Sequence, residues 1–107
     1  MKRLMILLLL ATTAQAANEI RAFCPGITTA YALIRETDGD VWHVADQQFE
    51  PWGTDANDAD DYDITLSDKS GDFFVGDFEP NVPAGAYYIS VSHQVGGAPA
   101  DTDPVLW

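Results

Sequence analysis

The chain has 107 residues, and its 17 acidic side chains outnumber the five basic ones, which gives a formal net charge of −12 at pH 7. This field repels nucleic acid and anionic membrane surfaces, so we expect neither as a partner. Cations or a basic protein surface are better candidates, although acidic side chains also serve solubility. The one cysteine, Cys24, excludes an intramolecular disulfide and predicts either a buried thiol or a bond between two molecules.

The first 16 residues predict a cleaved signal peptide. Lys2 and Arg3 form a short basic region, an unbroken apolar run covers residues 4–10, and residues 14–16 (AQA) have the small-x-small pattern that signal peptidase cleaves. The apolar run is shorter than the about 20 residues of a membrane-spanning helix. We therefore expect a secreted protein, extracellular, at the cell surface or periplasmic, with no membrane segment in its mature form.

Cleavage at this site leaves a single domain of residues 17–107. Three basic residues then face all 17 acidic ones, a net charge of −14. A domain of this size without a disulfide depends on its apolar core, on a bound ion or on association with other chains.

The first half of the domain predicts short antiparallel strands. Residues 18–24 are consistent with an edge strand, and residues 28–36 (TTAYALIRE) form a strong strand with apolar side chains on both faces. Such a strand is central or is covered on its second side. The Asp38-Gly39 pair predicts a tight hairpin turn, after which residues 41–44 return antiparallel. Residues 49–52 are an edge strand or a loop.

The second half continues in the same way. Residues 55–61 predict a loop or one short helical turn, and residues 67–71 predict a turn. Strands are expected at residues 62–66, with Tyr62, Ile64 and Leu66 inward, at 72–78, at 87–93, with Tyr87, Ile89 and Val91 inward, and at 103–107. Gly76 inside a strand indicates a bulge or a close backbone contact. The fold class is all-β, a small antiparallel β-sandwich of about seven strands, immunoglobulin-like.

The order of several short motifs carries a resemblance to a known kind of module. The motifs are YALIR (31–35), GDVW (39–42), FEPW (49–52), YDITL (62–66), GDFFVGDF (71–78), PAGAY (83–87) and QVGGAPADTD (94–103). This order resembles an uncharacterised β-sandwich module of bacterial surface proteins and phage tail or baseplate proteins. The PAGAY strand is also similar to strands of carboxypeptidase-regulatory-like and other immunoglobulin-like modules. The resemblance implies a structural or adhesive role and no catalytic residues.

The acidic stretch of residues 55–63 is the candidate metal site. Five carboxylates and one amide lie within these nine residues, and calcium prefers such oxygen ligands. Asp58, Asp60 and Asp63 are the first candidates, because their spacing brings them together where a loop enters a strand. The spacing is not that of an EF-hand, so a solvated acidic loop is the alternative.

Aromatic and histidine residues give weaker signals. Trp52, in a Pro/Gly context beside the acidic stretch, is the candidate ligand-binding residue for carbohydrate stacking. Trp42 and Trp107 are expected to lie in the core. His43 and His93, the only histidines, occupy strand positions and are expected to be satisfied structural residues. No Gly-x-Ser-x-Gly elbow exists, and a sandwich this small rarely has a cleft, so we do not expect an enzyme.

The expected function is therefore a secreted, non-enzymatic module that acts by protein contact, in adhesion, assembly or at a surface, with a partner protein or its own copies. The alternative is a calcium-dependent or carbohydrate-binding module that uses residues 55–63 and Trp52. An unpaired apolar edge strand would favour assembly by strand addition.

Overall fold

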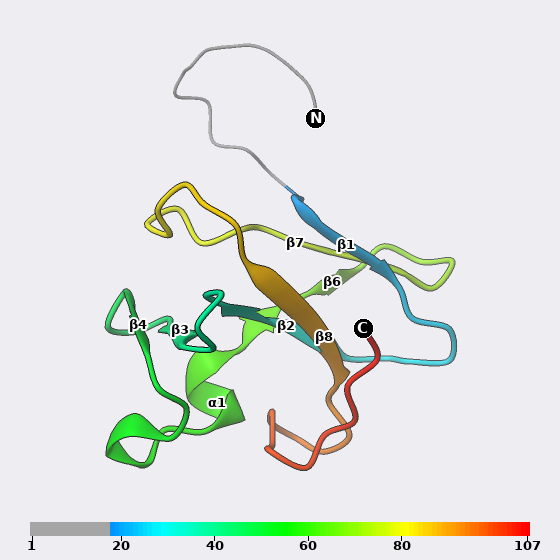
Figure 1. Ribbon diagram of the computed structural model, residues 1–107. Coiled ribbons are helices and arrows are strands. Elements are labelled where there is room, and N and C mark those ends of the chain that lie inside the picture. Colours follow the sequence, from blue (N-terminus) through cyan, green and yellow to red (C-terminus); the bar gives the residue numbers. More distant parts are fainter. Residues whose placement is uncertain (1–17) are drawn as a thin grey trace, which may run out of the picture.

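A computed structural model describes residues 18–107, so the predicted signal peptide (1–16) lies outside the described residues and stays a prediction. Two antiparallel sheets pack as a sandwich (Figure 1). The three-stranded sheet has the order β1-β7-β6, from β1 (Ile20–Phe23), β7 (Phe73–Gly76) and β6 (Ser67–Asp68). The five-stranded sheet contains β2 (Ala30–Arg35), β3 (Val41–His43), β4 (Gln48–Glu50), β5 (Ile64–Thr65) and β8 (Tyr88–His93). The predicted all-β sandwich is confirmed.

Strand β2 is the centre of the larger sheet. One of its edges pairs with all six residues of β8, and the other pairs with β5 at Tyr31 and with β3 at Arg35. Its inward side chains, which include Ile34, lie in the core between the sheets. Tyr31 and Leu33 lie in a second apolar cluster on the opposite face of the sheet. Both faces of β2 are therefore covered, as the sequence predicted.

The second cluster is covered by a short helical segment. A 3₁₀ turn (Thr54–Ala56) leads into α1 (Ala59–Tyr62), so the predicted helical turn in this stretch is confirmed. The Asp58 side chain accepts a hydrogen bond from the backbone N–H of Asp60, and the Asp61 side chain accepts one from that of Asp58. This capping box satisfies N–H groups that the first helical turn leaves free. Tyr62 is fully buried at the end of α1.

Three predictions about strand boundaries were wrong. Tyr62 belongs to α1 and packs in the second cluster, because the capping box starts a helix where period-two alternation predicted a strand. Residues 67 and 68, predicted as a turn, pair with β7 as β6. Residues 103–107 form no regular strand and make only one bridge to β8, between Val105 and Ser92. In residues 18–107, no helix has the length and apolar character needed to cross a bilayer.

Gly76 shows why glycine stands inside β7. A β-carbon at this position would lie 2.4 Å from Leu66 Cδ2 and 3.5 Å from the carbonyl oxygen of Thr65. The predicted close contact is confirmed. We expect Gly76→Ala to lower the free energy of unfolding by about 1–2 kcal/mol, because the buried Leu66 side chain must move to make room. Urea denaturation measures this loss, and Gly97→Ala, where nothing lies within 4 Å, is the control that leaves stability unchanged.

Candidate functional site

Strands β1 and β8, at the edges of the two sheets, both contribute residues to an apolar groove. The groove has a volume of about 660 Å³. Its apolar lining includes Ile20, Ala22, Phe23, Phe78, Ile89 and Trp107. The inner face of the sandwich is thus accessible from this side. Ile89, predicted to be a core residue, remains 36% exposed because no further strand covers it.

Backbone groups of β1 are free to pair at the groove. The N–H of Cys24 donates to the carbonyl oxygen of Asp72 on the side of β7. Because hydrogen-bonding direction alternates along an antiparallel strand, Ala22 also points its backbone groups at β7, and Arg21 and Phe23 point theirs away. Among residues 18–107, the N–H and carbonyl groups of Arg21 and the N–H of Phe23 have no partner on the outer edge of β1, which leaves part of this edge as a template for adding a strand.

The outer edge of β8 is covered only in part. The N–H groups of Val91 and His93 donate to the carbonyl oxygens of Trp107 and Pro104. Ile89 has the same outward orientation, by the same alternation, and its N–H has no acceptor among residues 18–107. The Trp107 indole N–H donates to the carbonyl oxygen of Phe23, 3.2 Å away, and so connects the two edges at one end of the groove.

The rim of the groove combines exposed aromatic side chains with acidic ones. Phe23 and Trp107 line the groove and are each more than 60% exposed, so the prediction that Trp107 lies in the core was wrong. Glu19 lies at the start of β1 and accepts a hydrogen bond from the N–H of Phe78, and Asp77 accepts one from the N–H of Asn18. Both carboxylates are among the 17 acidic residues that give residues 17–107 their net charge of −14. The groove is therefore apolar inside, and its charged lining residues are Glu19 and Arg21.

The structure does not bring Asp58, Asp60 and Asp63 together. Asp58 uses its carboxylate as the helix cap, and Asp63 follows α1, where burial raises its pKa and the nearby charge of Asp60 raises it further. Two other groups of residues in the described part of the chain have metal-ligand spacing, and neither includes these three. Capping accounts for Asp58 without an ion, and calcium binding here stays a prediction of the sequence.

Trp52 is partly covered. The guanidinium carbon of Arg35 lies 4.8 Å from the centre of its ring, and the ring of Tyr62 is 4.9 Å away. The indole is 37% exposed and lines a second, more polar concavity of about 450 Å³ beside β8. Its contacts leave less of the ring for a sugar than a free stacking platform would offer. Carbohydrate binding at Trp52 stays a prediction.

The remaining polar candidates have structural surroundings. Cys24 is 2% exposed, so the predicted buried thiol is confirmed, and burial raises its pKa. His93 pairs with Ala30 in the sheet. His43 differs from the prediction of a satisfied residue, because its buried Nδ1 has no hydrogen-bond partner.

Sequence reasoning missed the groove, although it identified β1 as an edge strand. The groove depends on how the edges of two sheets align, which strand patterns do not specify. The one available signal was Phe23, a large apolar residue on the outward face of an edge strand. No family model matches the chain, and the comparisons found no similar curated protein and no similar solved structure.

Proposed function

We propose that this domain is an exported, non-enzymatic β-sandwich module that binds an extended segment of another protein in the groove between β1 and β8. The observation that carries the proposal is the apolar groove directly beside the outer edge of β1, where the backbone groups of Arg21 have no partner among the described residues. A peptide that adds a strand to such an edge gains main-chain hydrogen bonds, and its alternate side chains enter the groove.

The chemistry of the groove defines the partner. Its apolar interior fits small or branched apolar side chains at every second position of the bound segment. The carboxylates of Glu19 and Asp77, with the strongly negative domain around them, favour lysine or arginine at the positions between. Complementary charge of this kind speeds association and rejects acidic partners. We therefore infer a basic, alternating apolar segment as the occupant.

A proline at the outward-facing position of β1 tests this proposal. Arg21→Pro removes an N–H that points to the free edge and leaves the pairing with β7 intact, which edge strands tolerate. A fluorescein-labelled nonapeptide of alternating valine and lysine serves as the probe in fluorescence anisotropy. We expect Arg21→Pro to weaken its binding at least about tenfold, through the lost hydrogen bond and the blocked edge.

Arg21→Ala is the matched control, because it removes the same side chain and keeps the N–H. It should bind the probe as tightly as the unaltered chain or more tightly, since a positive charge leaves the groove. A peptide of alternating valine and glutamate should not bind. Circular dichroism and thermal melting establish that both variants fold. Equal binding of the probe by Arg21→Pro and Arg21→Ala would contradict strand addition at β1.

A further inference from the structure

The β3–β4 hairpin gathers one histidine and two carboxylates. His43 ends β3, Asp46 lies in the turn, and Glu50 ends β4. Val41 pairs with Glu50 and His43 with Gln48, so His43 and Glu50 are diagonal neighbours on one face of the hairpin. The N–H of Gln47 donates to the carbonyl oxygen of His43 and closes the turn that brings Asp46 back over the strand.

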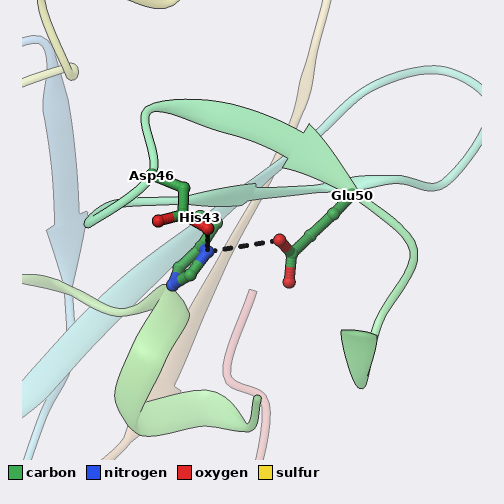
Figure 2. Close-up of side chains that lie close together, drawn as sticks. All are labelled: His43, Asp46 and Glu50. Carbon is green, nitrogen blue, oxygen red and sulfur yellow. Dashed lines mark ion pairs between the residues drawn. The ribbon is translucent and has the colours of Figure 1, made fainter. Parts of the chain in front are cut away.

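The three side chains converge on one ring nitrogen, as Figure 2 shows. His43 Nδ1 lies 3.1 Å from Asp46 Oδ2 and 3.2 Å from Glu50 Oε1. Both separations are within ion-pair distance, but the geometry gives Nδ1 no hydrogen bond to either carboxylate or to any other group in residues 18–107. His43 is only 7% exposed, so this nitrogen has no access to water either. A buried polar atom without a partner is costly and requires an explanation.

The surroundings hold Glu50 in position for a ligand. Its Oε2 accepts hydrogen bonds from Asn57 Nδ2 at 2.9 Å and from the Tyr62 hydroxyl at 2.7 Å. These bonds fix the orientation of the carboxylate, with Oε1 turned towards His43. Outer contacts that orient a ligating carboxylate in this way are typical of metal sites.

The donor set selects the class of metal. A tetrahedral ion with bonds of about 2.0–2.2 Å to nitrogen and oxygen places its ligand atoms about 3.3–3.5 Å apart, close to the separations between Nδ1 and the two oxygens. Imidazole suits zinc and its neighbours in the first transition row, whereas calcium and magnesium prefer oxygen ligands alone. The Asp46 side chain is 57% exposed and free to adjust its distance.

We propose that His43 Nδ1, Asp46 and Glu50 bind one Zn²⁺ ion, with water in the fourth position. The ion would satisfy the orphaned ring nitrogen and offset part of the negative charge of the domain. This site lies on the hairpin and is independent of the groove between β1 and β8.

Zinc binding by tag-free protein tests the proposal, because a histidine tag would itself bind the metal. Isothermal titration with ZnCl₂ should give one site per chain. Zinc at a hundredfold excess over the dissociation constant should raise the melting temperature by at least about 10 °C. Asp46→Asn, at an exposed position that leaves the fold intact, should weaken binding at least about tenfold and remove the thermal shift.

The acidic turn of Glu36, Asp38 and Asp40, in which Asp38 is exposed, provides the matched control, since it is the other group with metal-ligand spacing in residues 18–107. Asp38→Asn changes the net charge by the same amount and should leave zinc affinity unchanged. Replacing zinc with cobalt should give visible absorption bands of a tetrahedral ion, absent in Asp46→Asn. The proposal is overturned if one millimolar zinc neither binds nor shifts the melting temperature, or if both variants bind alike.

Discussion

Replacing Phe74 with alanine is expected to lower the free energy of unfolding by about 3–5 kcal/mol, the range for a buried phenylalanine whose removal leaves a cavity. Phe74 is 1% exposed and stands in the middle of β7, where its side chain fills the core between the two sheets. In a domain of this size the loss corresponds to a fall in melting temperature of at least about 12 °C. Urea denaturation followed by tryptophan fluorescence measures it.

Phe23→Ala is the control for this effect, because it removes the same side chain from the same sheet at a position that is 61% exposed. The Phe23 ring contacts only the edge of the sandwich, where it lies 5.0 Å from the ring of Phe73. We expect Phe23→Ala to lower the free energy of unfolding by no more than about 1 kcal/mol. Similar losses for the two variants would show that the sheets do not pack through Phe74.

Replacing Tyr62 with phenylalanine is expected to lower the free energy of unfolding by about 1.5–3 kcal/mol. The substitution removes a single oxygen atom. The hydroxyl is fully buried, donates to the Glu50 carboxylate and accepts a hydrogen bond from the N–H of Gly53 at 3.2 Å. Burial and the bond to Glu50 raise its pKa to about 12, so it remains a donor at neutral pH. Hydrogen bonds to charged groups are worth more than neutral ones, and the variant leaves the buried Glu50 carboxylate with one donor fewer.

Tyr31→Phe is the matched comparison. Its hydroxyl also donates to a carboxylate, that of Asp103 at 2.9 Å. Asp103 is only half-buried and accepts a further bond from the N–H of Ala100, so water can replace the lost donor. We expect Tyr31→Phe to lower the free energy of unfolding by about 0.5–1.5 kcal/mol. Equal losses in the two variants would contradict the inference that the buried Tyr62–Glu50 hydrogen bond stabilises the fold more than the half-buried Tyr31–Asp103 bond.

The elements that sequence reasoning predicted well are those whose signal is local. The Asp38-Gly39 pair makes the expected tight turn, with Gly39 at φ 101° and the N–H of Glu36 donating to the carbonyl oxygen of Asp40. The unbroken apolar character of residues 30–34 identified the central strand before its partners were known. Each of these depends on a few neighbouring residues and on backbone preferences that tertiary contacts did not override.

Tyr62 shows where local signals conflict. Together with Ile64 and Leu66 it completes a period-two pattern, and the same stretch begins with the Asp58–Asp61 capping box. The cap determines the structure as far as Tyr62, and the strand pairing of β5 begins only at Ile64. Tyr62 and Ile64 consequently pack on opposite faces of the larger sheet.

The hairpin cluster was missed for a different reason. His43 and Glu50 become neighbours only through the register of β3 and β4, and residues 49–52 were compatible with either a strand or a loop. A histidine followed by carboxylates three and seven positions later, across a predicted turn, was the usable signal. Taken alone, His43 in a strand position indicates only a structural residue, and the spacing to Asp46 and Glu50 carries the signal.

The pairing of β2 with β8 has a consequence for the order of folding. Every residue of the central strand pairs with one that lies more than 50 positions later in the chain. Closing a loop of this length costs chain entropy before the contacts between β2 and β8 stabilise the fold. We therefore expect slow folding, in about milliseconds to seconds. Until β8 has been synthesised, the apolar strand β2 lacks the partner strand with which all six of its residues pair. The larger sheet is therefore complete only after residues 88–93 have been made.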